Sequence, residues 1–564
     1  MQRAETTIAA TSLGLLLLLS LSQILLRNLL GFSYPEIDII NRHLLVICGM
    51  MGAVLATSKY AHIKTDALNI LLSEKIKKNI QLPLSTFSAL ICLALCYYSV
   101  IFVGDEWQYA PANERWTLPF TLVYPISFAL MSCHFVLNEI LRKKSKVTLL
   151  VLLLVIIAFI GAPLFIVLGA GGLLASFATD ISPDILIIEM NRLTTTPNMI
   201  ALPLFILAGV VMTHGGAANR LVSFYRATFG FLPGGLAIVA LISCAFFTMF
   251  SGASGVTILA LGGLLYPVLK NEGYQQNFSL GLLTTSGSLG LLFPPSLALI
   301  IYGIVANVSI EDMFLAGLLP GLLLIILLSL YSGYSAHKSH VTKHVFLVGD
   351  VIKAARNCIW DLFLPIGIII GIFGGFVSLT EAAAFTAAYV LFIDTVIYKT
   401  ISLKHDASRL FTEASLLFGS LIIILLIALG LTNLLIDAQI PMKLLGFIEQ
   451  YIDTKIQFLI LLNIFLLLVG AVMDIFSALL VIVPLLLPLA ARYDVHPIHL
   501  GIIFLANLEI GYSTPPIGIN LFIASQRFKE PIHTLFRSTL PFLLIMLIWL
   551  LIITYTPVLS LWRL

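Results

Sequence analysis

Two short clusters of glycine and proline interrupt long apolar stretches of the chain, and they share one pattern. Residues 290–295 read Gly-Leu-Leu-Phe-Pro-Pro, and residues 511–516, which lie 221 positions later, read Gly-Tyr-Ser-Thr-Pro-Pro. About 40 residues before each pattern lies another helix-breaking cluster, at residues 251–254 (Ser-Gly-Ala-Ser) and 470–474 (Gly-Ala-Val-Met-Asp). Because a Pro-Pro pair removes two consecutive amide donors, a helix must open there, and freed carbonyl oxygens can then bind a cation such as sodium.

The position of these breaks in apolar sequence favours a binding site. Within the hydrocarbon region, irregular backbone is tolerated only where it is buried in protein or lines a cavity. One Gly-Pro interruption is most simply a kink or a helix-packing contact, but interruptions at corresponding positions of two halves are typical of a transporter's midplane site. A hard cation needs oxygen ligands. The hydroxyl groups available for this purpose are those of Ser251, Ser254, Ser513 and Thr514.

Three carboxylates stand among apolar neighbours: Glu381, Asp474 and Glu509. An ionisable residue at membrane depth is a functional candidate by default. Asp474 adjoins the Gly470 break, so we expect it near the site and treat it, with Ser513, as a candidate substrate contact. Glu381 could instead cap the start of a helix.

The elements that must position these residues are membrane helices. Of 564 residues, 59% are hydrophobic and only 10% are charged, whereas a soluble globular chain carries about 25% charged residues. A helix crosses the bilayer with roughly 20 apolar residues, so the chain holds on the order of fifteen crossings or half-crossings. The composition argues against soluble enzymes and nucleic-acid-binding proteins, and a net charge of +3 is too small to indicate a polyanionic partner.

The sequence contains no pattern that predicts an enzyme. It has no Ser-His-Asp constellation, no phosphate-binding loop and no cluster of metal ligands. Cys92 and Cys96 would share one helix face, but two thiols do not complete a metal site. We therefore expect a protein without catalytic activity.

The apolar runs form a four-helix N-terminal block and a longer second part. The first four runs lie at about 8–26, 43–57, 84–103 and 118–137. Lysine and arginine gather after the second and fourth runs, which indicates that these links and the N-terminus are cytoplasmic. No small-residue cleavage pattern follows the first run, so we expect it to be retained as a helix. The predicted domains are residues 1–141, a basic linker at 142–146, and residues 147–564 with halves at about 147–337 and 358–564.

Several stretches resemble the membrane subunits of the tripartite ATP-independent periplasmic (TRAP) transporters. The second part is similar to the large subunit at LPLFILAG (202–209), the 251–254 cluster, GLLFPPS (290–296), GLLPG (317–321), LTEAA (379–383) and GYSTPPIGINLF (511–522), in the order of that family. The first 141 residues are similar to the small subunit at Leu25-Leu26-Arg27, around Glu36, and at Ala61-His62-Ile63-Lys64. The chain thus resembles a natural fusion of both subunits.

The resemblance implies a fold and a function. The expected fold is an all-α, polytopic integral membrane protein of the inverted-repeat, elevator type, with two helical hairpins and an N-terminal four-helix scaffold block. The expected function is sodium-driven import, across the bacterial inner membrane, of an organic acid delivered by a separate soluble periplasmic binding protein. Sialic acid, C4-dicarboxylates and sugar acids are all candidate substrates. The fused small subunit would allow the chain to work as a monomer.

The resemblance also implies two sodium sites. The first would use Ser251, Ser254, Gly290, Phe293 and Pro295, and the second would use Gly470, Gly511, Thr514 and Ile517. Phe293 and Ile517 would contribute only backbone carbonyls. Ala253 stands at a position that is often serine in relatives. The cluster therefore offers two hydroxyl groups, those of Ser251 and Ser254.

Two rival hypotheses stay open on the sequence alone. One is a sodium-coupled dicarboxylate carrier that works without a binding protein, although such a carrier has no need for the four-helix block. The other is a non-transporting channel or membrane scaffold, against which the paired discontinuous segments argue.

Overall fold

The computed structural model is built of helices joined by short connections. It describes residues 2–27, 34–59, 61–62, 74–109, 115–140, 163–179, 182–192, 197–232, 234–252, 254–339, 347–437, 452–515 and 518–563. Within these ranges, 11 helices are long and apolar enough to cross a membrane, and up to 13 if each of two bent helix pairs counts as one span. The prediction of an all-α, polytopic membrane protein is confirmed. The predicted linker at 142–146 lies outside the described residues.

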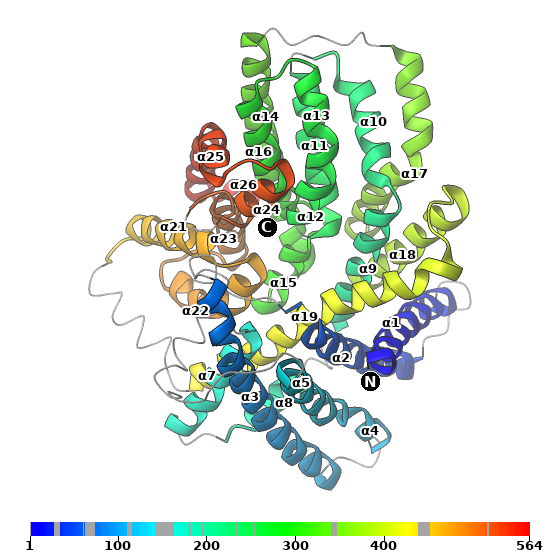
Figure 1. Cartoon of the computed structure of the whole chain (residues 1–564), viewed down its shortest axis with the longest axis vertical. Coiled ribbons are helices and arrows are strands. Elements are labelled where there is room, and N and C mark those ends of the chain that lie inside the picture. The colour runs from blue at the N-terminus through cyan, green and yellow to red at the C-terminus, as the bar shows by residue number, and fades with distance from the viewer. Residues whose placement is uncertain are drawn as a thin grey trace. The chain divides into compact units, whose positions relative to one another are not determined.

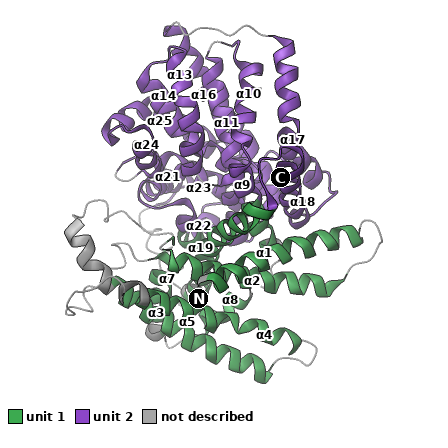
Figure 2. Cartoon of the chain, turned by 45° about the vertical axis from the view of Figure 1, so that its right-hand side comes forward, with its two compact units in different colours: residues 1–207, 404–448, 480–485 green, residues 208–403, 449–479, 486–564 purple. Residues whose placement is uncertain are grey.

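The chain divides into two compact units (Figure 2). Unit 1 comprises residues 1–207, 404–448 and 480–485, and unit 2 comprises residues 208–403, 449–479 and 486–564. Each unit is therefore assembled from segments that are distant in the sequence.

Unit 1 contains the N-terminal helices. They are α1 (Gln2–Leu25), α2 (Pro35–Ser58), α3 (Glu74–Tyr109), α4 (Leu118–Thr121), α5 (Val123–Ile140), α7 (Leu164–Thr179), α8 (Ile185–Arg192), the first half of α9 (Ala201–His214) and nearly all of α19 (Leu403–Asp437). Helices α1 and α2 pack side by side, as do α3 and α5 (Figure 1). A buried pair, His134 Nε2 and Glu5 Oε1 at 3.0 Å, joins α5 to α1.

Helix α19 packs directly against the N-terminal helices of unit 1. Gly52 of α2 and Gly419 of α19 meet through their backbones, since a Cβ on Gly52 would lie 2.9 Å from Gly419 Cα. Beside this contact, the Ser415 hydroxyl donates a hydrogen bond to the carbonyl of Ala9 in α1 at 3.1 Å. Small residues allow such close approach of membrane helices. A helix of the second part of the sequence thus belongs to the same unit as the N-terminal block.

Unit 2 contains the helix breaks. Its first group of helices is α10 (Ala217–Phe229), α11 (Gly235–Ser251), α12 (Ser254–Thr257), η5 (Ile258–Gly262), α13 (Gly263–Asn271), α14 (Gln276–Thr285), η6 (Ser286–Leu292), α15 (Leu297–Val305) and α16 (Ile310–Lys338). Helices α17 (Val348–Phe373) and α18 (Leu379–Phe392) follow, with a short π-helical segment η7 (Ile393–Ile397). The last group is α21 (Lys455–Val472), most of α22 (Ile475–Arg492), α23 (Pro497–Gly511), α24 (Ile519–Phe528), α25 (Ile532–Tyr555) and α26 (Val558–Leu561).

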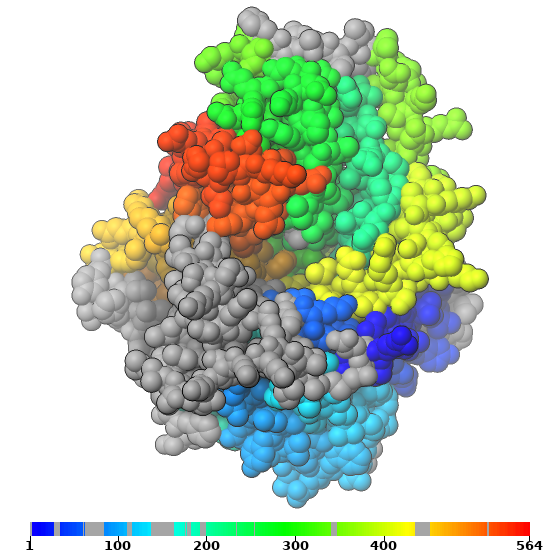
Figure 3. Space-filling model, viewed as in Figure 1, coloured from blue at the N-terminus to red at the C-terminus, as the bar shows by residue number. Residues whose placement is uncertain are grey.

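The first and last groups of unit 2 follow the same order. Helix α11 ends at Ser251 and α21 ends at Val472, so both end at the clusters that the sequence marks as helix-breaking. In each group, the helix before the first break packs against the helix before the second: α11 contacts η6, and α21 contacts α23. The two groups also contact each other, since α25 packs on α14 and α16; the red surface of α25 adjoins their green surface in Figure 3.

The start of α18 explains one of the three carboxylates that stand among apolar neighbours in the sequence. The Ser378 hydroxyl accepts a hydrogen bond from Glu381 N, and the Glu381 carboxylate accepts one from Ser378 N at 2.8 Å. This reciprocal arrangement satisfies two amide donors of the first helical turn. The alternative that Glu381 caps a helix is confirmed.

Candidate functional site

The first break begins where α11 ends. Gly252 adopts a left-handed conformation with φ of 65°, which favours glycine because a Cβ is strained there. Its N–H donates to Thr248 O at 2.8 Å and closes the last turn of α11. Helix α12 starts two residues later, at Ser254. Ala253, which lies between them, is outside the described residues.

The second break of this group lies in η6, which follows α14. The chain becomes extended at Phe293, with φ of −97° and ψ of 137°, before the two prolines. Gly290 of η6 packs on α11, where a Cβ would lie 2.6 Å from Thr248 Cβ and still closer to Ala245 O and Met249 N. The structure therefore brings together the two clusters that the sequence separates by about 40 residues.

Thr248 ties these segments to one another. Its hydroxyl oxygen lies 2.6 Å from Thr257 Oγ1 of α12 and donates to Gly287 O of η6 at 2.7 Å. The side chain is fully buried. The sequence did not predict this residue, because a single threonine inside the apolar helix α11 belongs to no recognisable motif.

Two hydroxyl groups without a hydrogen-bond partner lie in the segments that form the first two breaks. Ser251 is half-buried and its Oγ has no hydrogen-bond partner. Ser254 and Pro295 are buried. Ser286, at the start of η6, is fully buried and its Oγ also lacks a partner; it was not predicted. An unpartnered buried hydroxyl costs free energy, so these atoms are suited to bind a ligand.

The third break separates α21 from α22. The chain is extended at Met473, and Asp474 is the N-cap of α22. Asp474 Oδ2 accepts hydrogen bonds from Phe476 N at 3.0 Å and Ser477 N at 3.1 Å, and Oδ1 accepts one from the Ser477 hydroxyl. The carboxylate thus satisfies amide groups that the first turn of a helix leaves unpaired.

The fourth break follows α23 and lies against the third. Gly511 contacts Gly470 through the backbone, since a Cβ on Gly511 would lie 2.6 Å from Gly470 Cα and 2.8 Å from Ala471 N. Beyond the break, Gly518 N donates to Ala471 O at 3.2 Å. The second pair of clusters is therefore also brought together. Ile517 lies outside the described residues.

The polar side chains of the fourth break differ in their partners. The Thr514 hydroxyl donates to Ile510 O at 2.9 Å, which leaves its lone pairs free. Ser513 is fully buried and its Oγ has no partner. Asn520, at the start of α24, is fully buried with neither side-chain atom hydrogen-bonded; it was not predicted. Glu509 of α23 is fully buried, and neither of its carboxylate oxygens has a hydrogen-bond partner.

These donors define the chemistry that the breaks can support. Among the described residues, no group of three or more His, Cys, Asp or Glu side chains is placed to hold a metal ion. The breaks instead offer hydroxyl and carbonyl oxygens, which suit hard cations. Helix N-termini at the same breaks suit anions.

Comparison with known proteins identifies both parts of the chain. Residues 148–559 match the family model described as tripartite ATP-independent periplasmic transporter, DctM component. Residues 16–146 match the model of the DctQ component of the same transporters. The two matches meet at residues 146 and 148, beside the basic stretch of the sequence.

Individual relatives agree with these matches. The chain is 35% identical to the C4-dicarboxylate TRAP transporter large permease protein DctM of Pseudomonas aeruginosa. The alignment spans 385 residues and covers 67% of this chain and 90% of that protein. It is 33% identical over 406 residues to the isethionate TRAP transporter permease protein DctMQ of Oleidesulfovibrio alaskensis. That alignment covers 71% of this chain and 63% of that protein. A solved structure, the YdaH transporter of Alcanivorax borkumensis, aligns with a TM-score of 0.43 and 14% identity over 65% of this chain and 88% of that one.

The family assignment agrees with the structure. Members of this family are multi-pass inner-membrane transporters, and the described part of this chain has 11 helices suited to span a membrane. The chain belongs to the tripartite ATP-independent periplasmic (TRAP) transporter family, and it carries the small and large membrane components, DctQ and DctM, in one polypeptide.

Proposed function

We propose that this chain couples the entry of sodium ions to the import of a small organic anion that a soluble periplasmic binding protein delivers. Family membership supports transport with a binding protein. The observation that supports sodium coupling is the pairing of breaks within unit 2, where backbone contacts at glycine hold unpartnered hydroxyls close to opened helix ends. Opened helices of this kind offer carbonyl oxygens to sodium and N-termini to anionic substrates.

The proposal assigns one sodium ion to each pair of breaks. The first ion would be bound by Ser251, Ser254, Gly290, Phe293 and Pro295, and the second by Gly470, Gly511, Thr514 and Ile517. Asp474 and Ser513 adjoin the second pair and are proposed to contact or orient the substrate. Ser286 and Asn520, whose buried polar atoms lack partners, extend the set of candidate ligands.

We infer an anionic substrate from two of the relatives. The relatives described above are named for C4-dicarboxylates and isethionate, which are organic anions at neutral pH. Sialic acid and sugar acids share this property, so they remain within the proposal. The proposed elevator mechanism follows from the family resemblance.

Sodium entry supplies sufficient free energy for this task. One ion that moves down a tenfold gradient releases about 1.4 kcal/mol, and a membrane potential of about 100 mV adds roughly 2.3 kcal/mol per charge. Two sodium ions would therefore more than offset the cost of moving one monoanion against the potential. The coupling would support accumulation of the substrate inside the cell.

Uptake into proteoliposomes tests the proposal. We expect accumulation of the anion only when external sodium and the loaded binding protein are both present. Full uptake in potassium-only buffer would overturn sodium coupling. Full uptake of free substrate without the binding protein would instead favour the carrier that works alone. In the same assay, Ser254→Ala should raise the sodium concentration for half-maximal uptake, whereas Ser332→Ala, which removes a buried hydroxyl bonded within α16, should not.

At Asp474, the helix-capping role of the side chain can be separated by substitution from the role of its negative charge. Asparagine caps helices about as well as aspartate, whereas alanine costs about 1 kcal/mol. We expect Asp474→Asn to preserve thermal stability but to raise the sodium or substrate concentration for half-maximal uptake. Asp474→Ala should lower both stability and uptake. Wild-type uptake by the asparagine variant would limit Asp474 to its capping role.

A further inference from the structure

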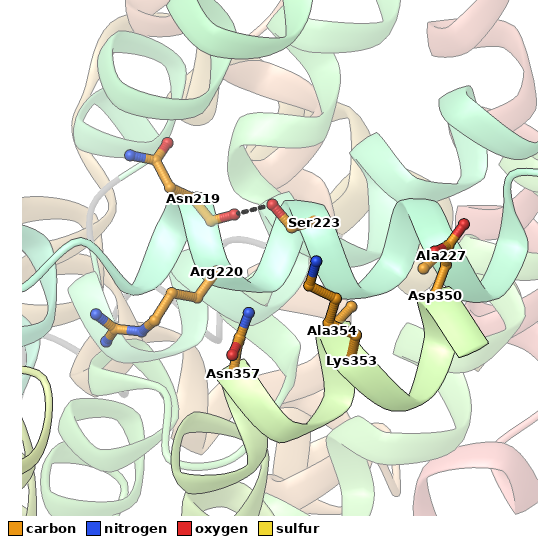
Figure 4. Close-up of a pocket in the computed structure, with 8 residues that line it drawn as sticks. All are labelled: Asn219, Arg220, Ser223, Ala227, Asp350, Lys353, Ala354 and Asn357. Carbon is orange, nitrogen blue, oxygen red and sulfur yellow. Dashed lines mark hydrogen bonds between the residues drawn. The ribbon is translucent and has the colours of Figure 1, made fainter. Parts of the chain in front are cut away.

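A groove of about 400 Å³, lined by six polar or charged residues and two alanines, lies between α10 and α17, apart from the helix breaks. Asn219, Arg220 and Ser223 line it from α10, and Asp350, Lys353 and Asn357 line it from α17. Figure 4 shows these side chains along the two helices, which pack against each other within unit 2. Nothing in the transport proposal uses this groove.

The arginine of the groove is already neutralised. Arg220 Nε and Nη2 donate to the Asp361 carboxylate at 2.6 and 2.8 Å, and Nη2 also lies 3.2 Å from Asp394 Oδ1. Its guanidinium carbon stacks 3.7 Å from the Tyr398 ring centroid. Arg220 therefore forms part of the wall and offers little free charge to a ligand.

Two exposed groups of opposite sign remain. Lys353 and Asp350 stand about one turn apart on α17, and neither side chain has a partner among the residues that the structure describes. The carboxamides of Asn219 and Asn357 add donors and acceptors. Of the charged residues that line the groove, Asp350 and Lys353 are the two whose charges are not already paired. This balance disfavours a simple anion and favours a ligand that carries both charges.

The surroundings of the groove are those of a membrane surface. On α17, Ile352 is 63% exposed, Ile359 is 54% exposed and Trp360 is 42% exposed, so apolar side chains flank the polar groups. Tryptophan is enriched at the level of the lipid headgroups. The basic stretch that precedes and enters α17, residues 338–356, is cytoplasmic by the positive-inside bias.

We propose that the groove between α10 and α17 binds the headgroup of phosphatidylethanolamine from the cytoplasmic leaflet, with its phosphate at Lys353 and the carboxamides and its ammonium at Asp350. A primary ammonium donates charge-assisted hydrogen bonds to a carboxylate, whereas the trimethylammonium of phosphatidylcholine has no N–H to donate. Phosphatidylglycerol lacks the positive charge that would pair with Asp350. The acyl chains lie along the exposed apolar face of α17.

Native mass spectrometry of the purified full chain tests the proposal. Palmitoyl-oleoyl phosphatidylethanolamine should bind at least about tenfold more tightly than the corresponding phosphatidylcholine or phosphatidylglycerol. Asp350→Asn should remove the preference over phosphatidylcholine, and Lys353→Gln should weaken the binding of all three lipids. The exposed control variants Asp453→Asn and Lys270→Gln, which lie outside the groove, should change nothing.

Three results would overturn the proposal. The first is equal binding of the three lipids, and the second is unchanged selectivity in both groove variants. The third is full competition by soluble phosphoethanolamine at the concentration of the lipid, because it would assign the groove to a free headgroup. Since both substituted side chains are exposed, the variants should fold, and their thermal unfolding measured alongside should match that of the wild type.

Discussion

The Gly511→Ala variant is expected to lose uptake. In the native packing, a methyl group at this position would lie 2.6 Å from Gly470 Cα and 2.8 Å from Ala471 N, so the backbone of α21 would have to move. Overpacking of this kind typically costs about 1–3 kcal/mol. The displaced segment carries the oxygens assigned to the second sodium ion. Gly290→Ala should act in the same way at the first site, where the methyl group would lie 2.6 Å from Thr248 Cβ.

Controls separate this effect from the general cost of removing a glycine. Gly104 of α3 and Gly171 of α7 have no heavy atom within 4 Å of an added Cβ, so their alanine variants should transport like the wild type. The measurement is sodium-dependent uptake in proteoliposomes, with thermal unfolding of each variant in detergent alongside. Wild-type uptake by Gly511→Ala would show that the close contact between α21 and α23 is not needed for transport.

Arg220→Gln is expected to destabilise unit 2 strongly. The substitution would leave the carboxylates of Asp361, 6% exposed, and Asp394, 1% exposed, without their guanidinium partner. Breaking a buried ion pair by removing one partner typically costs about 3–5 kcal/mol. The variant would also lose the hydrogen bond from Arg220 Nη1 to Gly215 O, at 2.7 Å, which holds the turn between α9 and α10. We expect a lower midpoint of thermal unfolding and a lower yield of folded protein.

A matched arginine provides the control. Arg226, also on α10, pairs with Glu272 at 3.0 Å but its side chain is 43% exposed, and an exposed pair contributes only about 0–1 kcal/mol. Arg226→Gln should therefore unfold near the wild-type midpoint. Adding Asp361→Asn to Arg220→Gln should restore part of the stability, because it removes an unpaired buried charge. Equal stability of the two arginine variants would contradict the role assigned to the Arg220 cluster.

The helix breaks could be predicted from the sequence because their causes are local. Gly252 ends α11 through its own backbone conformation, and a Pro-Pro pair cannot continue a helix whatever surrounds it. The helix cap at Glu381, which the sequence offers as an alternative, is also local, because its partner Ser378 is three residues away. The membrane-spanning character followed from composition alone. The sodium ligands themselves stay a prediction.

The contacts that assemble these elements could not be predicted in this way. Arg220 meets Asp361 and Asp394 across 141 and 174 residues of sequence, and Ser415 of α19 meets Ala9 across 406. The sequence does not distinguish Ser286, Thr248 and Asn520 from other isolated polar residues. Their significance depends on the packing that buries them. The sequence by itself determined where helices form and where they open, because capping, glycine and proline act within one turn of the chain. Only the tertiary structure decided which openings and which charges meet, because burial and pairing depend on segments that hydrophobic periodicity does not relate to one another.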